Sequence, residues 1–222
     1  MSGGLRLYAY PGTAAMVPHL LLRELALPFE WVQVDRPNDA HKSAEYLRLN
    51  PNGLIPALVD ARGDVAVVLY ETAAICLHLV DTCPQAGLVP PVGGAARAHA
   101  YKWLVWLSAT LQPALLARFY PERWVDEGNA AGVAQVRAHA EARVGELLGQ
   151  LEAQLASHGA DWLLGDAYSL VDPYAFTLCR WTRGFERPAR ELPQVGRWLA
   201  RMLERPAVRA TLAAEGHAPP FV

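Results

Sequence analysis

The stretch Asn50–Leu58, NPNGLIPAL, constrains the fold most, because it places a proline at the start of a strand. Asn-Pro and Asn-Gly pairs favour turns, and the apolar residues Ala57–Val59 are typical of a strand. An X-Pro bond is the one peptide bond that becomes cis at a cost of only about 0.5–1 kcal/mol. We therefore predict a cis Ile55–Pro56 bond that leaves the N–H and C=O of Ile55 unpaired by the sheet. An extended peptide can then pair with Ile55 as an added strand.

A second motif, Leu69–Ile75 (LYETAAI), indicates a strand that passes directly into a helix. Glu71 and Thr72 lie at this junction, so a carboxylate and a hydroxyl stand beside the free N–H groups of a helix N-terminus. Both residues are candidates for ligand contact. The alternative for Glu71 is a structural one, since the positive end of the helix dipole favours an acidic residue.

The order of elements predicts two domains of different class. Before residue 84 the patterns predict strands at 5–10, 30–34, 57–60 and 64–68, and helices at 14–26, 43–49 and 71–81. This βαβ, α, ββα order is that of an α/β thioredoxin-like domain, placed at 1–84. Residues 85–94 are rich in Pro and Gly and indicate a linker. Residues 95–222 then form an all-α domain, with helices expected at 95–120, 130–157, 170–184, 193–204 and 207–215.

The two motifs together resemble the glutathione-binding core of the cytosolic glutathione transferases, through Asn-Pro-x-Gly-x-Ile-Pro-Ala-Leu and Glu-Thr-x-Ala-Ile. The bacterial beta class is the most similar branch, through Tyr10–Gly12 (YPG) and His19–Glu24 (HLLLRE). The resemblance covers nearly the whole chain. It implies the glutathione transferase fold, glutathione as co-substrate and a homodimer. It extends to Ser169 and Asp172, a capping box to which we assign a structural role: Ser169 can cap the helix, while Asp172 reaches back to the Ser169 N–H.

The resemblance also implies how glutathione binds. Ile55, followed by Pro56, holds the cysteinyl backbone, Glu71 meets the γ-glutamyl ammonium group, and Thr72 meets the γ-glutamyl carboxylate. Lys42 is a candidate for the glycyl carboxylate, because related enzymes often carry a basic residue in this segment. The alternative for Lys42 is an ordinary solvated surface lysine.

The group that activates the thiol is harder to assign. An unperturbed thiol has a pKa of about 8.5, so only about 3% is thiolate at pH 7. Beta-class enzymes carry Pro-Gly-Ala-Cys-Ser, whose cysteine contacts the glutathione sulfur, and a histidine on the first helix of the second domain. This chain has Ala14 and Gln112 at those positions. The tyrosine of the mammalian-type classes falls on Ala9.

Thr13 remains as the candidate catalytic residue. It follows Pro-Gly directly, where the serine-type classes place their hydroxyl, and the helix N-terminus beside it favours an anion. Three alternatives stay open: Thr13 only caps the first helix, the backbone N–H of Ala14 is the donor, or the donor is Tyr10, which we otherwise place in the wall of the binding site.

The second substrate is expected between the domains, against the first helix of the helical domain. Candidates are the aromatic and amide side chains Trp103, Trp106, Gln112, Phe119 and Tyr120, with Trp181 on a later helix. Aromatic residues at helical spacing are equally typical of a core.

Composition excludes several other classes. A formal net charge of −2 gives no reason to expect nucleic acid or an anionic membrane as a partner. The three cysteines have no metal-like spacing, so no metal site and a reducing cytoplasm are expected. The chain begins without a signal-peptide pattern, and its longest apolar stretch, 65–80, is too short to span a bilayer.

The sequence therefore predicts a cytoplasmic, homodimeric glutathione transferase. It conjugates the glutathione thiol to a small apolar electrophile, or reduces a peroxide, by stabilising the thiolate and holding the substrates together. The alternative is a non-catalytic or weakly active glutathione-fold binding protein, since the usual cysteine, histidine and tyrosine are all absent. A scaffold that uses the fold for protein contacts is a third reading.

Overall fold

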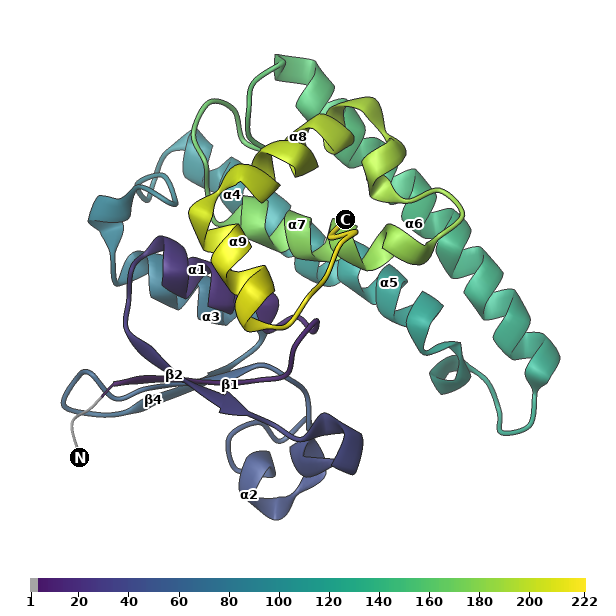
Figure 1. Ribbon diagram of the computed structural model, residues 1–222, viewed down its shortest axis with the longest axis horizontal. Coiled ribbons are helices and arrows are strands. Elements are labelled where there is room, and N and C mark those ends of the chain that lie inside the picture. The colour runs from purple at the N-terminus through teal and green to yellow at the C-terminus, as the bar shows by residue number, and fades with distance from the viewer. Residues whose placement is uncertain (1–3) are drawn as a thin grey trace. The chain divides into compact units, whose positions relative to one another are not determined.

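In the computed structural model, which describes residues 4–222, four strands form one mixed sheet in the order β2-β1-β3-β4 (Figure 1). The strands are β1 (Leu5–Ala9), β2 (Phe29–Gln33), β3 (Ala57–Asp60) and β4 (Val67–Tyr70). β1 and β2 are parallel, as a crossover through a helix requires, and the other two pairs are antiparallel. The buried strands β1 and β3 form the centre of the sheet, and β4 is an edge.

Two helices cover one face of this sheet, α1 (Met16–Glu24) and α3 (Thr72–Asp81), while α2 (Ala44–Leu47) lies on its opposite side (Figure 1). Every residue of α1 from Met16 to Leu22 is buried, and α3 buries an apolar stripe at helical spacing. The predicted thioredoxin-like domain is therefore confirmed, with each of its predicted elements present.

β4 begins later than the sequence predicts. The expected strand was 64–68, whereas Val67 pairs with Asp60 and Tyr70 pairs with Ala57. The connection from β3 is longer than a tight turn because Arg62 folds back onto Asp60. Its backbone N–H and its guanidinium both donate to the Asp60 carboxylate, at 2.7–3.1 Å.

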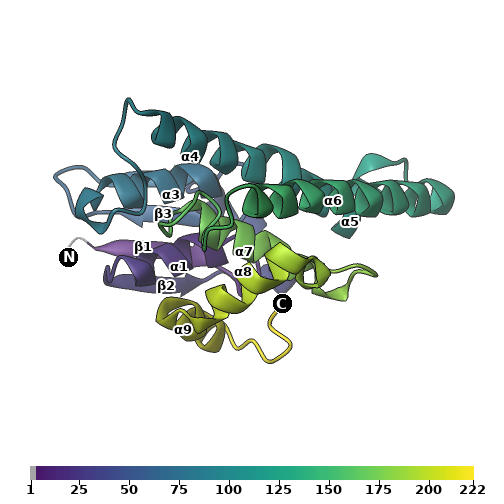
Figure 2. The same cartoon turned by 90° about the horizontal axis from the view of Figure 1, so that it is seen from above.

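The chain divides into two compact units, and the division differs from a single break at the linker. The first unit contains residues up to Val89 and also Arg205–Ala218, whereas the second contains Pro90–Glu204 and Pro219–Val222. The predicted helical domain 95–222 thus does not keep its last helix, α9 (Pro206–Ala214). α9 lies beside α1 (Figure 2), where Arg205 makes two hydrogen bonds of 2.7 Å to Glu24.

The second unit is helical throughout, as predicted. It contains α4 (Ala95–Trp106), α5 (Gln112–Phe119), α6 (Ala130–His158), α7 (Val171–Trp181) and α8 (Pro193–Glu204). Residues 171–180 of α7 are all buried, so α7 forms the core of this unit. No helix in the described part of the chain is both long enough and apolar enough to cross a membrane.

Asp172 organises the start of α7. Its Oδ2 accepts hydrogen bonds from the N–H and the hydroxyl of Ser169, and its Oδ1 accepts from Leu163 N–H and Trp198 Nε1. The predicted return contact from Asp172 to the Ser169 N–H is present. The Ser169 hydroxyl, however, donates to the same carboxylate and makes no capping bond to the helix.

A π-helical segment, Leu107–Leu111, separates α4 from α5 within one long helix. Pro113 explains this widening, because it lacks the N–H that would bond to the carbonyl of Ala109, and its ring crowds that carbonyl. The irregularity ends at Gln112, the residue that occupies the position of the beta-class histidine. π-Helical turns occur frequently at functional sites.

Candidate functional site

Three loops of the first unit meet at one end of the sheet. Tyr8 pairs with Ala57, and Ala57 pairs with Tyr70, so the end of β1, the start of β3 and the end of β4 are neighbours. The loops beyond these strand ends carry most of the predicted site residues: Tyr10, Thr13, Ile55, Pro56, Glu71 and Thr72. The fold thus brings together six residues that are separated by up to 62 positions in the chain.

Ile55 presents a free peptide edge at this end of the sheet. The Ile55–Pro56 bond is cis. The preceding carbonyl, that of Leu54, accepts hydrogen bonds of 2.7 Å from both Tyr46 Oη and Asn50 Nδ2. The N–H and C=O of Ile55 make no hydrogen bond to any residue from 4 to 222. One free donor and one free acceptor on an anchored residue are what an added strand needs.

Glu71 occupies an unusual backbone conformation. Its φ is +71° and its ψ is 111°, a region that residues other than glycine rarely adopt. Such conformations persist where the surrounding structure imposes them, and they concentrate at binding sites. The exposed side chain makes no ion pair or hydrogen bond with the described part of the chain, and it does not cap α3. Its carboxylate is therefore available to an external cation.

The N-terminus of α3 lies directly beyond Glu71. The Ile75 N–H is the first to bond into the helix, at 3.0 Å from Glu71 O, so the N–H groups of residues 72–74 have no helical partner. Thr72 adds a hydroxyl to this group, although its side chain is largely buried. An acidic side chain next to free N–H groups suits a ligand that carries an ammonium and a carboxylate on one carbon.

The Thr13 hydroxyl is already hydrogen-bonded within its own loop. Thr13 Oγ donates to the carbonyl oxygen of Tyr10 at 2.7 Å, and it accepts the N–H of Ala15 at 3.3 Å. Thr13 therefore shapes the turn between β1 and α1. To donate to a ligand, its hydroxyl has to leave Tyr10, at a cost of about 0.5–1.5 kcal/mol for one hydrogen bond.

The N–H of Ala14 is the open donor in the same turn. The N–H of Gly12 donates to Glu215, that of Thr13 to Tyr10, and those of residues 15–17 to Thr13 and Ala14. Within the described chain the Ala14 N–H has no acceptor. It also stands at the positive end of α1, where an anion is favoured.

Lys42 lies on the surface with an exposed side chain, and its Nζ is 3.0 Å from Asp39 Oδ1. The hydrogen bond and the charge of Lys42 lower the pKa of Asp39. The 3-10 turn that contains Lys42 is close to the Ile55 loop, because the His41 carbonyl oxygen lies 3.3 Å from where a side chain on Gly53 would begin. Lys42 can therefore bind a ligand at the Ile55 loop only if its ammonium group leaves Asp39.

Glu215 is a site-region residue that sequence reasoning missed. Its carboxylate accepts the N–H of Gly12 at 2.8 Å and contacts His19 Nδ1 at 2.9 Å. No local pattern could reveal this contact, because 203 residues separate Glu215 from Gly12.

The candidates for the second substrate lie in the second unit and do not form one group. Trp103 is buried against Trp106, with ring centroids 5.0 Å apart. Gln112 Oε1 accepts a hydrogen bond of 2.6 Å from the Tyr174 hydroxyl.

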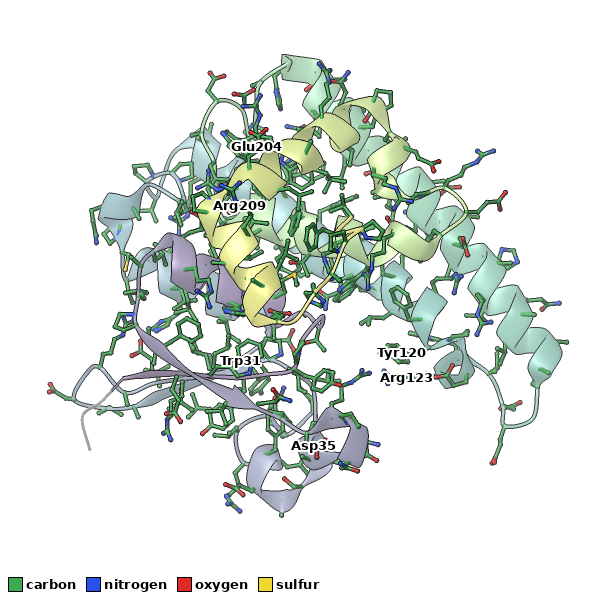
Figure 3. All side chains as sticks on the ribbon, viewed as in Figure 1. Trp31, Asp35, Tyr120, Arg123, Glu204 and Arg209 are labelled. Carbon is green, nitrogen blue, oxygen red and sulfur yellow. The ribbon has the colours of Figure 1, made fainter. Side chains whose placement is uncertain are left out.

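The aromatic residues at the other end of α5 are more exposed. Phe119, 40% exposed, packs against Trp181 and Phe185. Arg123 covers the ring of Tyr120 at 4.1 Å, and both residues are labelled in Figure 3. No group of His, Cys, Asp or Glu side chains in residues 4–222 could hold a metal ion.

Comparison with known proteins defines the class. Residues 14–82 match the family described as Glutathione S-transferase, N-terminal domain, and residues 104–206 match its C-terminal domain. The chain belongs to the glutathione S-transferase family, as the sequence motifs predicted.

Several relatives align over almost the full chain. Glutathione S-transferase GST-4.5 of Xanthomonas campestris is 32% identical, with 96% of this chain and 99% of the relative covered. Glutathione S-transferase GstA of Escherichia coli O157:H7 is 29% identical over 96% of this chain and 99% of the relative. A glutathione transferase homologue from Sulfitobacter, solved with bound glutathione, has a TM-score of 0.85 at 27% identity, covering 98% of this chain and all of that one.

Proposed function

We propose that this protein binds glutathione at the end of its sheet and transfers the glutathione sulfur to a small apolar electrophile. The observation that carries the proposal is the free N–H and C=O of Ile55 beside the unpaired carboxylate of Glu71 and the open N-terminus of α3. Glutathione matches this set of groups: its cysteinyl residue is an extended peptide, and its γ-glutamyl end carries an ammonium and a carboxylate on one carbon.

The proposed contacts follow from this match. The cysteinyl N–H and C=O pair with Ile55, and the γ-glutamyl ammonium meets Glu71. The γ-glutamyl carboxylate meets the Thr72 hydroxyl and the free N–H groups of α3. Lys42 is the candidate for the glycyl carboxylate, in competition with Asp39. Tyr10 belongs to the wall of the site. The Sulfitobacter relative, which holds glutathione in the same fold, supports this assignment.

Thiolate stabilisation is assigned to the turn between β1 and α1. Lowering the thiol pKa by two units takes about 2.7 kcal/mol. One hydrogen bond to a charged group contributes about 1.5–3 kcal/mol, and a helix N-terminus adds about 0.3–1 kcal/mol. A single donor is thus sufficient. Thr13 Oγ and Ala14 N–H are the two candidates within this turn, and of these only the Ala14 N–H can serve without breaking a bond in the loop. The Tyr10 hydroxyl stays the third alternative.

In conjugation, the thiolate sulfur forms a bond to an electrophilic carbon, and the displaced group leaves with the bonding electrons. In peroxide reduction, the thiolate attacks one peroxide oxygen and a second glutathione completes the disulfide, with release of alcohol and water. Relatives carry more than one activity in their names, since the E. coli protein YfcG, 27% identical, is named a disulfide-bond oxidoreductase. The acceptor is therefore proposed only by its class.

The second candidate function is glutathione binding without appreciable turnover. It is favoured by one observation, that Ala14 and Gln112 stand in place of the cysteine and histidine of the beta class. The Gln112 side chain makes a hydrogen bond to Tyr174 within its own unit. The two candidate functions make opposite predictions for the state of the bound thiol.

The test is the ultraviolet absorbance of bound glutathione as a function of pH, which reports thiolate directly. A transferase gives a bound-thiol pKa at least one unit below the free value, together with turnover of a chlorodinitrobenzene or an organic hydroperoxide. Binding with an unshifted pKa and no turnover would establish the binding protein instead. Absence of binding at millimolar glutathione would contradict both, and would leave the scaffold reading.

A further inference from the structure

The C-terminal segment of the chain places a buried carboxylate directly behind the thiol-activating turn. Glu215 follows α9, and its side chain is completely buried. Its Oε2 accepts the N–H of Gly12 at 2.8 Å and lies 3.2 Å from His217 Nε2, while its Oε1 lies 2.9 Å from His19 Nδ1. Both oxygens are thus occupied by nitrogen partners, and one of these belongs to the backbone of the turn.

The hydrogen-bond direction at His19 follows from its other neighbour. Arg23 Nε lies 3.0 Å from His19 Nε2, and a guanidinium can only donate. His19 Nε2 therefore accepts, and the proton of the ring is on Nδ1, where it is donated to Glu215. The imidazole packs against Phe29 and Trp31, with ring centroids at 5.4 and 4.8 Å; Trp31 is labelled in Figure 3. Arg23 thus donates to His19 and His19 donates to Glu215, a directed chain that ends on the Glu215 carboxylate, which also accepts the Gly12 N–H.

Gly12 is suited to being held in this way. Its φ of +73° is accessible to glycine without strain, and a Cβ at this position would lie 3.3 Å from His217 Cε1. The N–H of Gly12 thus points at Glu215. Two residues further on, the N–H of Ala14 is the donor left open.

We propose that Glu215 is a positioning residue for thiol activation: by holding the Gly12 N–H it sets the turn so that the Ala14 N–H meets the glutathione sulfur. This inference rests on the proposed function. In this inference Glu215 does not touch glutathione, and it acts only through the backbone of the turn.

The negative charge of Glu215 and its positioning of the turn affect the bound-thiol pKa in opposite directions, so an experiment can tell them apart. A buried negative charge near the sulfur opposes the thiolate, so removing it without moving the turn would lower the bound-thiol pKa. Loss of positioning raises that pKa instead. In Glu215→Gln the amide cannot accept from both Gly12 and His19, because one of its two ends is a donor. We expect the bound-thiol pKa to rise by about one unit, with glutathione affinity within about threefold of wild type.

The control is Arg205→Ala. Arg205 also ties the C-terminal segment to the end of α1, through two 2.7 Å hydrogen bonds to Glu24, which lies outside the turn. This variant should lose thermal stability while its bound-thiol pKa stays at the wild-type value. A matching pKa rise in Arg205→Ala would show that Glu215 only anchors the segment, and would overturn the inference.

A rescue experiment tests the directed chain itself. In Arg23→Leu with Glu215→Gln, the His19 ring can carry its proton on Nε2, so that Nδ1 accepts from the Gln amide and the amide oxygen accepts from Gly12. We expect the bound-thiol pKa to return toward the wild-type value. If Glu215→Gln does not fold, Glu215→Asp serves, because its shorter side chain cannot reach Gly12 and His19 together.

The outcomes separate the two proposals. A wild-type protein whose bound thiol is unshifted contradicts the proposed function and, with it, the role of Glu215. A wild-type protein with a lowered thiol pKa that is unchanged or lowered further in folded Glu215→Gln or Glu215→Asp contradicts the role of Glu215 alone.

Discussion

The Thr13 hydroxyl donates to the carbonyl oxygen of Tyr10, 2.7 Å away, at the point where β1 turns toward α1. We expect Thr13→Val to raise the bound-thiol pKa by less than about one unit, because the Ala14 N–H remains in place. Loss of the loop hydrogen bond should lower the unfolding free energy by about 0.5–1.5 kcal/mol. Ultraviolet titration of bound glutathione and thermal denaturation measure the two effects. Thr13→Ser, which keeps the hydroxyl, is the control, and a rise of two units in Thr13→Val would make the hydroxyl itself the donor.

Glu71 should carry much of the affinity for glutathione. We expect Glu71→Gln to raise the Kd about tenfold or more, because a hydrogen bond to a charged group contributes about 1.5–3 kcal/mol. Isothermal titration calorimetry measures the change. Glu122→Gln, an exposed residue in the second unit, should leave the Kd unchanged. Equal affinity in Glu71→Gln and wild type would show that the γ-glutamyl end does not bind here.

The backbone of Glu71 gives a separate prediction. A non-glycine residue at φ +71° carries a strain of about 1–3 kcal/mol, which glycine does not. We expect Glu71→Gly to unfold at the same temperature as wild type or higher, although it binds glutathione poorly. A variant that loses stability as well as binding would show that the carboxylate has a structural partner.

Asp60 should make the first unit sensitive to acid. Hydrogen bonds from Arg62 and His78 hold the pKa of Asp60 well below its usual range. A lowered folded-state pKa contributes stability above the unfolded value, about 3.9, and this contribution is lost as the pH falls toward the folded value. We expect the unfolding free energy to decrease more steeply below about pH 4 in wild type than in Asp60→Asn. Denaturant unfolding across this pH range measures the free energy of both proteins. An equally steep decrease in wild type and Asp60→Asn would contradict the prediction.

The homodimer implied by the family resemblance gives a further prediction. The edge strand β4 exposes Val67, Val68 and Tyr70, and α4 exposes Tyr101 and Val105. Large exposed apolar side chains on an edge strand are unfavourable unless another surface covers them. We expect sedimentation of the wild-type protein to give twice the mass of one chain, and Val68→Glu or Val105→Glu to shift it toward the monomer. A monomeric wild type would refute the dimer.

Local sequence determined the elements of both units, because turn formers and apolar periodicity act over a few residues. The motif around Ile55 and the strand-to-helix junction at Glu71 were visible for the same reason. The helices 130–158 and 193–204 came within one residue of prediction, whereas the start of β4 did not, since Arg62 binds back onto Asp60 and lengthens the turn.

Other features depended on the tertiary structure. The sequence left the Thr13 hydroxyl, the Ala14 N–H and Tyr10 as alternative donors, because the direction of a hydroxyl is set by its neighbours in space. The fold shows that Thr13 already donates to Tyr10 and that the Ala14 N–H is open. The return of α9 to the first unit likewise depends on distant contacts, those of Arg205 with Glu24 and of Glu215 with His19.

The sequence by itself therefore determined the family, the two classes of domain and the free peptide edge at Ile55, since each depends on residues close together in the chain. Only the tertiary structure decided which donors of the turn between β1 and α1 are already hydrogen-bonded, and that Glu215 accepts the Gly12 N–H. Those contacts join residues 12 and 215, whose approach depends on the packing of α9 against α1.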